Sequence, residues 1–196
     1  MKRKIAFVFL LVVVAAICFL GYSIHNRIQQ KQAVAERIAT LPNFELVNLK
    51  AEVVNSSEIT KKSAVIITYF STECPFCRAE IKSMINHELL LDNANIYLIS
   101  GESIKALNQF AKTFSLDSLQ AIQILHDSKS RAKKLFGVNG VPHTFVYGKQ
   151  GKLLKQFEGE TTANLLFGLI KRSANNPDRV SNPVRVTEDI NEGGQE

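Results

Sequence analysis

Two cysteines separated by two residues, Cys74 and Cys77, follow an apolar, β-branched run. This run, residues 64–70 (AVIITYF), predicts a buried strand, and the periodic apolar pattern after it predicts a helix from Cys74 to about Leu90. Pro75 suits the first turn of that helix, because its missing N–H costs no hydrogen bond there. The unpaired N–H groups and partial positive charge of a helix N-terminus favour a thiolate. We therefore predict a redox site in which Cys74 attacks a disulfide and Cys77 resolves the mixed disulfide.

The same spacing also suits half of a zinc site or a structural disulfide. A zinc site needs a second pair of Cys or His ligands at a suitable spacing. Cys18 is the only other cysteine, and the four histidines, which form no close pair, are His25, His87, His126 and His143. We expect no metal and no cofactor beyond a redox-active Cys74–Cys77 disulfide, whereas the spacing alone leaves a structural disulfide open.

The N-terminal residues predict a membrane anchor. Lys2, Arg3 and Lys4 precede an uncharged apolar run, residues 5–22, whose length is near the lower end of the about 17–25 residues that span a bilayer. The run is longer than the roughly 7–15 apolar residues of a cleaved signal peptide. We expect an uncleaved signal anchor over residues 1–23, with its basic cluster in the cytoplasm and the rest of the chain outside, and cleavage stays an alternative.

Composition divides the remaining chain into three parts. Residues 24–40, rich in Gln, Ala and charged residues, predict a helical or semi-ordered juxtamembrane linker. Residues 41–174 suffice for one domain with a single hydrophobic core. Residues 175–196 contain two prolines and a Gly-Gly pair and predict a disordered tail. The net charge of +6 is concentrated toward the N-terminus, and no stretch mixes dense basic residues with aromatic ones, so we expect no nucleic-acid partner.

Strand and helix patterns alternate through the predicted domain. The expected strands are residues 44–49, 53–54, 64–70, 95–100, 122–125, 144–147 and 153–157. The expected helices are residues 74–90, 102–114, 128–136 and 161–173, and residues 56–62 read as a polar turn. This order predicts an α/β fold with a central mixed sheet flanked by helices.

The chain resembles thioredoxin-fold proteins, specifically the membrane-anchored TlpA/ResA-like thiol-disulfide oxidoreductases of the bacterial envelope. The resemblance rests on the strand–CxxC–helix unit, on residues 137–142 (GVNGVP) and on the glycine-flanked hairpin that follows. It implies that Pro142 is cis and faces the cysteines, and that the backbone of Val141 pairs with an extended substrate chain. Pro75 and Phe76 are expected to contact the substrate as well.

The same resemblance implies location and partners. We expect a single-pass protein of the bacterial cytoplasmic (inner) membrane with its domain on the periplasmic or extracytoplasmic side. The expected partners are oxidised or reduced protein substrates, and a membrane thiol donor or acceptor that recycles the site. Reduction is the expected direction, for example on the cysteines of apocytochrome c as in cytochrome c maturation.

Some residues depart from the thioredoxin pattern and are candidate modulators. Glu73 replaces a Trp and should oppose a neighbouring thiolate, and Thr68 stands where thioredoxin has a buried acid. Glu80, one helical turn beyond Cys77, is our third catalytic candidate, since it can take over proton transfer from that missing acid. His143 replaces a usual Thr after Pro142, and it either touches the site or points away.

Three other functions remain in competition. Anchored thioredoxin-fold copper-binding assembly factors carry CxxxC and a distant His, whereas this chain has CxxC. A non-catalytic, partner-binding domain would have unreactive thiols. A peroxidase is disfavoured, because Thr72 only loosely matches the Thr that such enzymes place two or three residues before the reactive cysteine.

Overall fold

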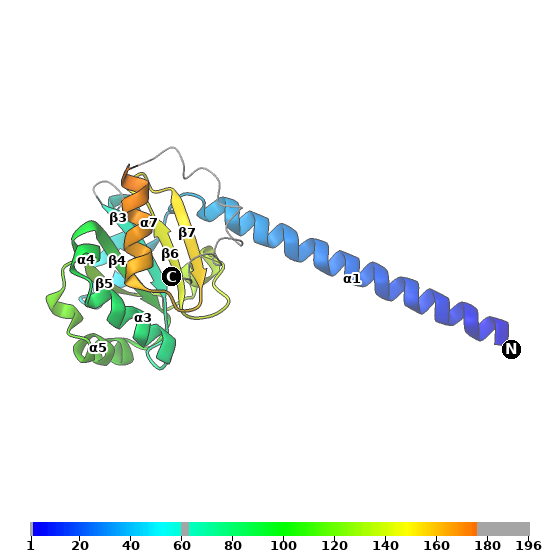
Figure 1. Cartoon of the computed structure of the whole chain (residues 1–196). Coiled ribbons are helices and arrows are strands. Elements are labelled where there is room, and N and C mark those ends of the chain that lie inside the picture. Colours follow the sequence, from blue (N-terminus) through cyan, green and yellow to red (C-terminus); the bar gives the residue numbers. More distant parts are fainter. Residues whose placement is uncertain (1, 60–62, 176–196) are drawn as a thin grey trace, which may run out of the picture. The chain divides into compact units, whose positions relative to one another are not determined.

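The computed structural model describes residues 2–59 and 63–175, with the side chains of residues 2–15 and 58 excepted (Figure 1). The chain divides into two compact units, Met1–Arg37 and Ile38–Glu196, which are described separately. The predicted tail, apart from Asn175, lies outside the described residues, as does the end of the predicted turn at 60–62.

Helix α1 (Lys2–Ile38) contains most of the predicted anchor and of the predicted linker, so the linker residues are helical up to Ile38. Most of the predicted anchor lies outside the residues whose side chains are described. Among the described residues, no helix combines the length and apolar character that a membrane crossing requires.

The second unit is built on a seven-stranded sheet with the order β2-β1-β5-β4-β3-β6-β7. The strands are β1 (Glu45–Asn48), β2 (Val53–Asn55), β3 (Ala64–Tyr69), β4 (Ala94–Ser100), β5 (Ile122–His126), β6 (His143–Tyr147) and β7 (Leu153–Glu158). Strand β4 pairs in parallel with β3 and β5, and the other neighbours pair antiparallel. The predicted mixed sheet is confirmed.

Residues 2–59 and 63–175 contain seven helices and one 3₁₀ turn. Those of the second unit are α2 (Ser56–Ile59), α3 (Pro75–Ile85), α4 (Glu88–Asn93), α5 (Ile104–Thr113), η1 (Leu116–Ser118), α6 (Arg131–Leu135) and α7 (Ala163–Asn175). The short α2 corrects the expected turn at its start, since Ser56 to Ile59 are helical. Figure 1 shows α7 lying along β6 and β7, against which it packs.

The helix expected from Cys74 to Leu90 is two helices. Helix α3 ends at Ile85, where the N–H of Asn86 bonds to the carbonyl of Lys82 at 3.2 Å. His87 then caps α4, its Nδ1 accepting the N–H of Leu90 at 3.1 Å. Apolar periodicity continues across this break, but Asn favours helix caps and turns over helix interiors.

Strand β3 is buried along its whole length, as a central strand should be. Its even-numbered side chains, such as Ile66, enter the main core together with Phe70, Ile81 and Leu166. Its odd-numbered side chains point to the opposite face, because successive residues of a strand alternate. Cys74 follows the end of β3 closely in the chain. The alternation therefore determines which side chains of β3 lie on the same face of the sheet as the cysteine motif.

Candidate active site

The two cysteines lie where β3 gives way to α3. Cys74 is the N-cap of α3, and its Sγ accepts the N–H of Cys77 at 3.3 Å. Pro75 takes the first helical position, as predicted. Both thiols are unbonded, with Cys74 half-buried and Cys77 buried. One sulfur is therefore accessible to a partner while the other lies directly behind it.

The peptide bond between Val141 and Pro142 is cis, as predicted, and it adjoins the accessible thiol. The Sγ of Cys74 donates to the carbonyl of Val141 at 3.8 Å. The Pro142 carbonyl accepts the N–H of Gly159 at 2.9 Å, and Gly159 has a φ of +102°, which glycine adopts readily. The structure thus brings Val141 and Pro142 to Cys74, and their role in substrate pairing stays a prediction.

Two large apolar side chains near Cys74 are solvent-exposed. Phe76, between the cysteines, is 59% exposed, and Val141 is 38% exposed. Pro75 is exposed as well, and so is Glu73 directly before the nucleophile. Single exposed apolar residues are common on protein surfaces, so the role of Phe76 and Val141 in substrate contact stays a prediction.

Glu80 is fully buried and belongs to a hydrogen-bonded chain below the cysteines. Thr144 donates its hydroxyl to Glu80 Oε1 at 2.5 Å, and the N–H of Thr161 donates to Oε2 at 3.1 Å. The hydroxyls of Thr68 and Thr144 are 2.8 Å apart. A hydroxyl has one hydrogen, so Thr144, which donates to Glu80, must accept from Thr68. Thr68 thus supports Glu80 indirectly.

The pKa values of Glu80 and Cys77 are both displaced upward. Burial raises the pKa of Glu80 to about 7, against the opposing hydrogen bonds from Thr144 and Thr161. Burial also raises the pKa of Cys77 to about 12, and its hydrogen bond with Cys74 and the charges of Cys74 and Glu80 add to the shift. A carboxylate that titrates near neutrality therefore lies one helical turn from a thiol that holds its proton, which suits proton transfer between them.

Neither Thr144 nor Thr161 was predicted from the sequence as a residue of the site. Thr144 is the register partner of Thr68 across β3 and β6, so both side chains project to the same face of the sheet. Pairing the two expected strands in the sequence would have found Thr144. Thr161 contributes its backbone, which carries no signal in the side-chain pattern.

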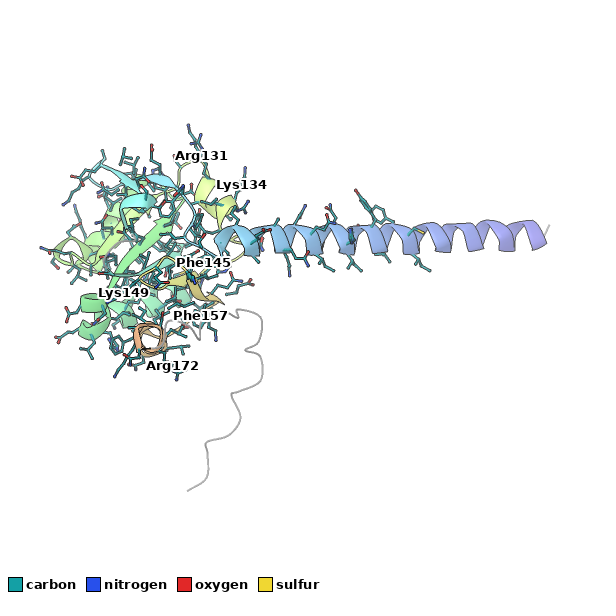
Figure 2. The ribbon with its side chains drawn as sticks, turned by 90° about the horizontal axis from the view of Figure 1, so that it is seen from above. Arg131, Lys134, Phe145, Lys149, Phe157 and Arg172 are labelled. Atoms are coloured by element: carbon teal, nitrogen blue, oxygen red, sulfur yellow. The ribbon has the colours of Figure 1, made fainter. Side chains whose placement is uncertain are left out.

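His143 lies on the other face of β6 from Thr144. Its ring is buried and stacks on Phe145, and the two ring centroids are 4.3 Å apart. Phe145 is labelled in Figure 2. Neither ring nitrogen makes a hydrogen bond of ordinary geometry. Burial lowers the pKa of His143, with Glu158 and Gln156 opposing the shift. Of the two expected orientations, this one points away from the Glu80 network, and an influence on the thiols stays a prediction.

Among the side chains that the structure describes, no three of His, Cys, Asp or Glu are grouped to hold a metal ion. The hydroxyl of Thr72 donates to a carboxylate, Glu102, at 2.5 Å. That hydroxyl is therefore not directed at Cys74 as a peroxidase mechanism would require.

Residues 39–156 match the sequence profile of the AhpC/TSA family. The chain belongs to this family. A curated relative, thiol-disulfide oxidoreductase ResA of Bacillus subtilis (strain 168), is 24% identical over 169 residues, which cover 84% of this chain and 91% of the relative. The ResA of Geobacillus thermodenitrificans (strain NG80-2) is 28% identical, covering 79% and 86% of the two chains.

A secreted disulfide oxidoreductase of Mycobacterium tuberculosis, homologous to E. coli DsbE, shares the fold. The match has a TM-score of 0.57 and 16% identity, and it covers 70% of this chain and 98% of that one. Together these similarities confirm the predicted resemblance to thioredoxin-like thiol-disulfide oxidoreductases.

Proposed function

We propose that this AhpC/TSA-family thiol-disulfide oxidoreductase is a tethered reductase of protein disulfides outside the cytoplasm. The observation that carries the proposal is the half-buried Cys74 sulfur, held at the N-terminus of α3 within 3.8 Å of the carbonyl before cis-Pro142. An extended client chain can reach the thiol and exposed backbone at the same place. Recognition through backbone groups tolerates many client sequences.

The reaction transfers two electrons from the dithiol to the client. The Cys74 thiolate attacks one sulfur of the client disulfide, forming a Cys74–client disulfide and releasing the other client sulfur as a thiolate. Cys77 then loses its proton, for which Glu80 is the proposed acceptor, and attacks Cys74. The Cys74–Cys77 disulfide forms, the second client thiolate leaves, and both client thiolates take up protons.

The oxidised site needs a reductant, and we propose a membrane-embedded dithiol protein as the donor. The proposed location is the outer side of a bacterial inner membrane, supported by the apolar run of residues 5–22 behind a basic cluster. The proposed clients are oxidised cysteines of envelope proteins, apocytochrome c among them. The reductive direction and these clients follow from the TlpA/ResA-like resemblance.

Thiol variants test the chemistry. Cys74→Ser should abolish reduction of insulin disulfides, and Cys77→Ala should accumulate mixed disulfides with clients, which mass spectrometry would identify. A Cys74→Ser protein that still reduces insulin would contradict the assigned nucleophile. A measured reduction potential near about −120 mV, as for a strong oxidant, would reject the reductive direction.

Labelling tests the location. A membrane-impermeant maleimide should modify Cys74 in intact cells, with Cys74→Ser as the control. Modification that requires lysis would place the domain on the cytoplasmic side and contradict the proposal.

A further inference from the structure

The turn that precedes Cys74 is hydrogen-bonded to Glu102, a residue that follows a different strand of the sheet. Glu102 lies between β4 and α5, and its carboxylate accepts the N–H of Thr72 at 3.1 Å and the Thr72 hydroxyl at 2.5 Å. The N–H of Glu102 itself bonds to Ser100 Oγ at 3.3 Å, which ties it to the end of β4. Thr72 is 5% exposed, whereas Glu102 is half-buried, so the buried ends of these bonds lie on the Thr72 side.

The carbonyl of Thr72 is held from α3. Arg78 donates through Nη1 to that carbonyl at 2.9 Å. The guanidinium carbon of Arg78 lies 5.7 Å from the ring centroid of Phe110 and 5.3 Å from that of Phe114. Both aromatic residues belong to the α5 segment, so the arginine is fixed by cation–π contacts rather than free to rotate. All three polar groups of Thr72 are therefore bonded.

The bonded turn leads directly to the thiol. Cys74 donates its N–H to the carbonyl of Ser71 at 3.3 Å, so Ser71 to Cys74 form one closed turn. The position of Thr72 thereby sets where Cys74 enters the N-cap position of α3. Small displacements matter there, because a misplacement of about 1 Å can reduce a reaction rate by about 10²-fold.

We propose that Glu102 and Arg78 are positioning residues that clamp Thr72, so that the Cys74 sulfur stays at the N-cap of α3 facing the Val141 carbonyl. The inference deepens the proposed function and rests on it. The clamp joins the β4–α5 connection to the redox motif, two segments about thirty residues apart along the chain.

The charge of the glutamate is part of the clamp. Burial alone would raise the pKa of Glu102, but hydrogen bonds from Ser71 and Thr72 outweigh it and lower that pKa. Glu102 is therefore an anion throughout the neutral range, and its hydrogen bonds are charge-assisted. A neutral glutamine of the same shape should hold the turn less firmly.

Four single variants and one double variant test the clamp in the full-length protein. Glu102→Gln removes the charge, Thr72→Val removes the hydroxyl, Thr72→Ser retains it, and Glu88→Gln is the matched control at an exposed helical glutamate. Two rates are measured: kcat/KM for insulin reduction, and alkylation of Cys74 by iodoacetamide at pH 7, followed on the Cys74 peptide by mass spectrometry so that Cys18 does not interfere. Melting temperatures control for folding.

We expect Glu102→Gln and Thr72→Val to lower kcat/KM about tenfold, through kcat rather than KM, within the range that misplacement produces. Alkylation of Cys74 should slow in the same two variants. The Glu102→Gln, Thr72→Val double variant should be no slower than the slower single variant. Both substitutions act on the same contact, the hydrogen bond from the Thr72 hydroxyl to Glu102, so their effects should not add. Thr72→Ser and Glu88→Gln should change either rate by about twofold at most.

Wild-type rates in Glu102→Gln and Thr72→Val would overturn the clamp, as would fully additive losses in the double variant. Losses that track a lowered melting temperature, or that Thr72→Ser shares, would assign both residues a merely structural role and also overturn it. Alkylation of Cys74 needs no client, so its rate reports on the clamp even if the wild-type protein reduces no disulfide. A wild-type protein that reduces no disulfide would contradict the proposed function, but it would not affect the test of the clamp.

Discussion

Glu80 and Glu102 both bring a carboxyl group to the redox motif, but their surroundings displace its pKa in opposite directions. Glu80 is fully buried, and burial outweighs its two hydrogen bonds, raising its pKa to about 7. Glu102 is half-buried, and there the hydrogen bonds from Ser71 and Thr72 outweigh burial and lower its pKa. One side chain type therefore supplies a group able to exchange a proton near neutrality and a group that stays charged.

The position of each carboxyl group matches its pKa. Glu80 lies beneath Cys77, the thiol that must lose a proton before it can resolve a mixed disulfide. Glu102 contacts the turn before Cys74, where a permanent charge strengthens hydrogen bonds. The comparison predicts that neutralising the two residues affects different steps and shifts stability with opposite dependence on pH.

The largest expected effect is on resolution. Glu80→Gln cannot accept a proton, so release of the client from the Cys74 mixed disulfide should slow on the order of 10²-fold, the lower range for general acid–base catalysis. Acid quenching and non-reducing gels would measure the lifetime of the mixed disulfide. Glu88→Gln is the control, because Glu88 is an exposed helical glutamate outside the hydrogen-bonded chain of Glu80.

An unchanged or shorter lifetime in Glu80→Gln would contradict the assignment. The Glu80 charge also raises the pKa of Cys77, so its removal favours the Cys77 thiolate. Faster resolution would therefore mean that charge repulsion, and not proton acceptance, is the main effect of Glu80.

Sequence patterns predicted the Glu80 region better than the Glu102 region. Glu80 lies at a fixed helical spacing from Cys77, and local periodicity on one element is visible in a sequence. Glu102 reaches Thr72 only because β4 lies beside β3 in the sheet, and a single chain pattern does not give such long-range contacts. The strands and the cysteine motif were predicted for the same reason that Glu80 was, since each depends on a local pattern.

The helix break after Ile85 and the burial of His143 were harder to predict. Asn86 and His87 interrupt an apolar periodicity that otherwise continues, and the cap at His87 is completed by a bond between His87 Nε2 and Asn164 Oδ1 at 3.0 Å, from the distant α7. His143 is buried and stacks on Phe145, whereas the expected strand at residues 144–147 did not include His143. Both outcomes depend on tertiary packing.

The pH dependence of stability gives the next largest effect. The folded protein retains the Glu80 proton up to about pH 7, whereas the unfolded chain releases it near 4.5. The folded state then binds more protons between these values, so the free energy of unfolding should fall by about 3 kcal/mol as pH rises through this window. Urea titrations of reduced protein, followed by tyrosine fluorescence, would measure the slope.

Glu80→Gln should remove that slope while leaving the rest of the pH profile in place. Tyr69, Tyr97 and Tyr147 are all buried in the second unit, so their fluorescence reports its unfolding. An identical slope in wild type and Glu80→Gln would show that Glu80 does not carry a raised pKa.

A smaller effect is expected at the hydroxyl that serves Glu80. Thr144→Val removes the donor to Glu80 Oε1 and the acceptor for Thr68 while nearly preserving shape. Leaving buried groups unpaired costs about 1–3 kcal/mol, so unfolding at pH 8 should become easier by about 2 kcal/mol. The pKa of Glu80 should rise further. Thr144→Ser keeps the hydroxyl, and a Ser variant as unstable as the Val variant would mean that packing, not the hydrogen bond, decides the result.

The smallest effect, and the one of opposite sign, is expected at Glu102. Its folded-state pKa is depressed, so its contribution to stability is present above the unfolded pKa and is lost as pH falls through the folded pKa. Because the carboxylate is half-exposed, solvent screening limits this contribution to about 1 kcal/mol or less. Glu102→Gln should therefore be slightly less stable than wild type at pH 7, and the difference should shrink as the pH falls below 4.5, the ordinary pKa of the carboxyl group. The same urea titrations would detect it, with Glu88→Gln as the control. If the stability difference between wild type and Glu102→Gln instead grew toward low pH, the pKa values of Glu80 and Glu102 would both be raised in the folded state. The assignment of proton exchange to Glu80 and of positioning to Glu102 would then be contradicted.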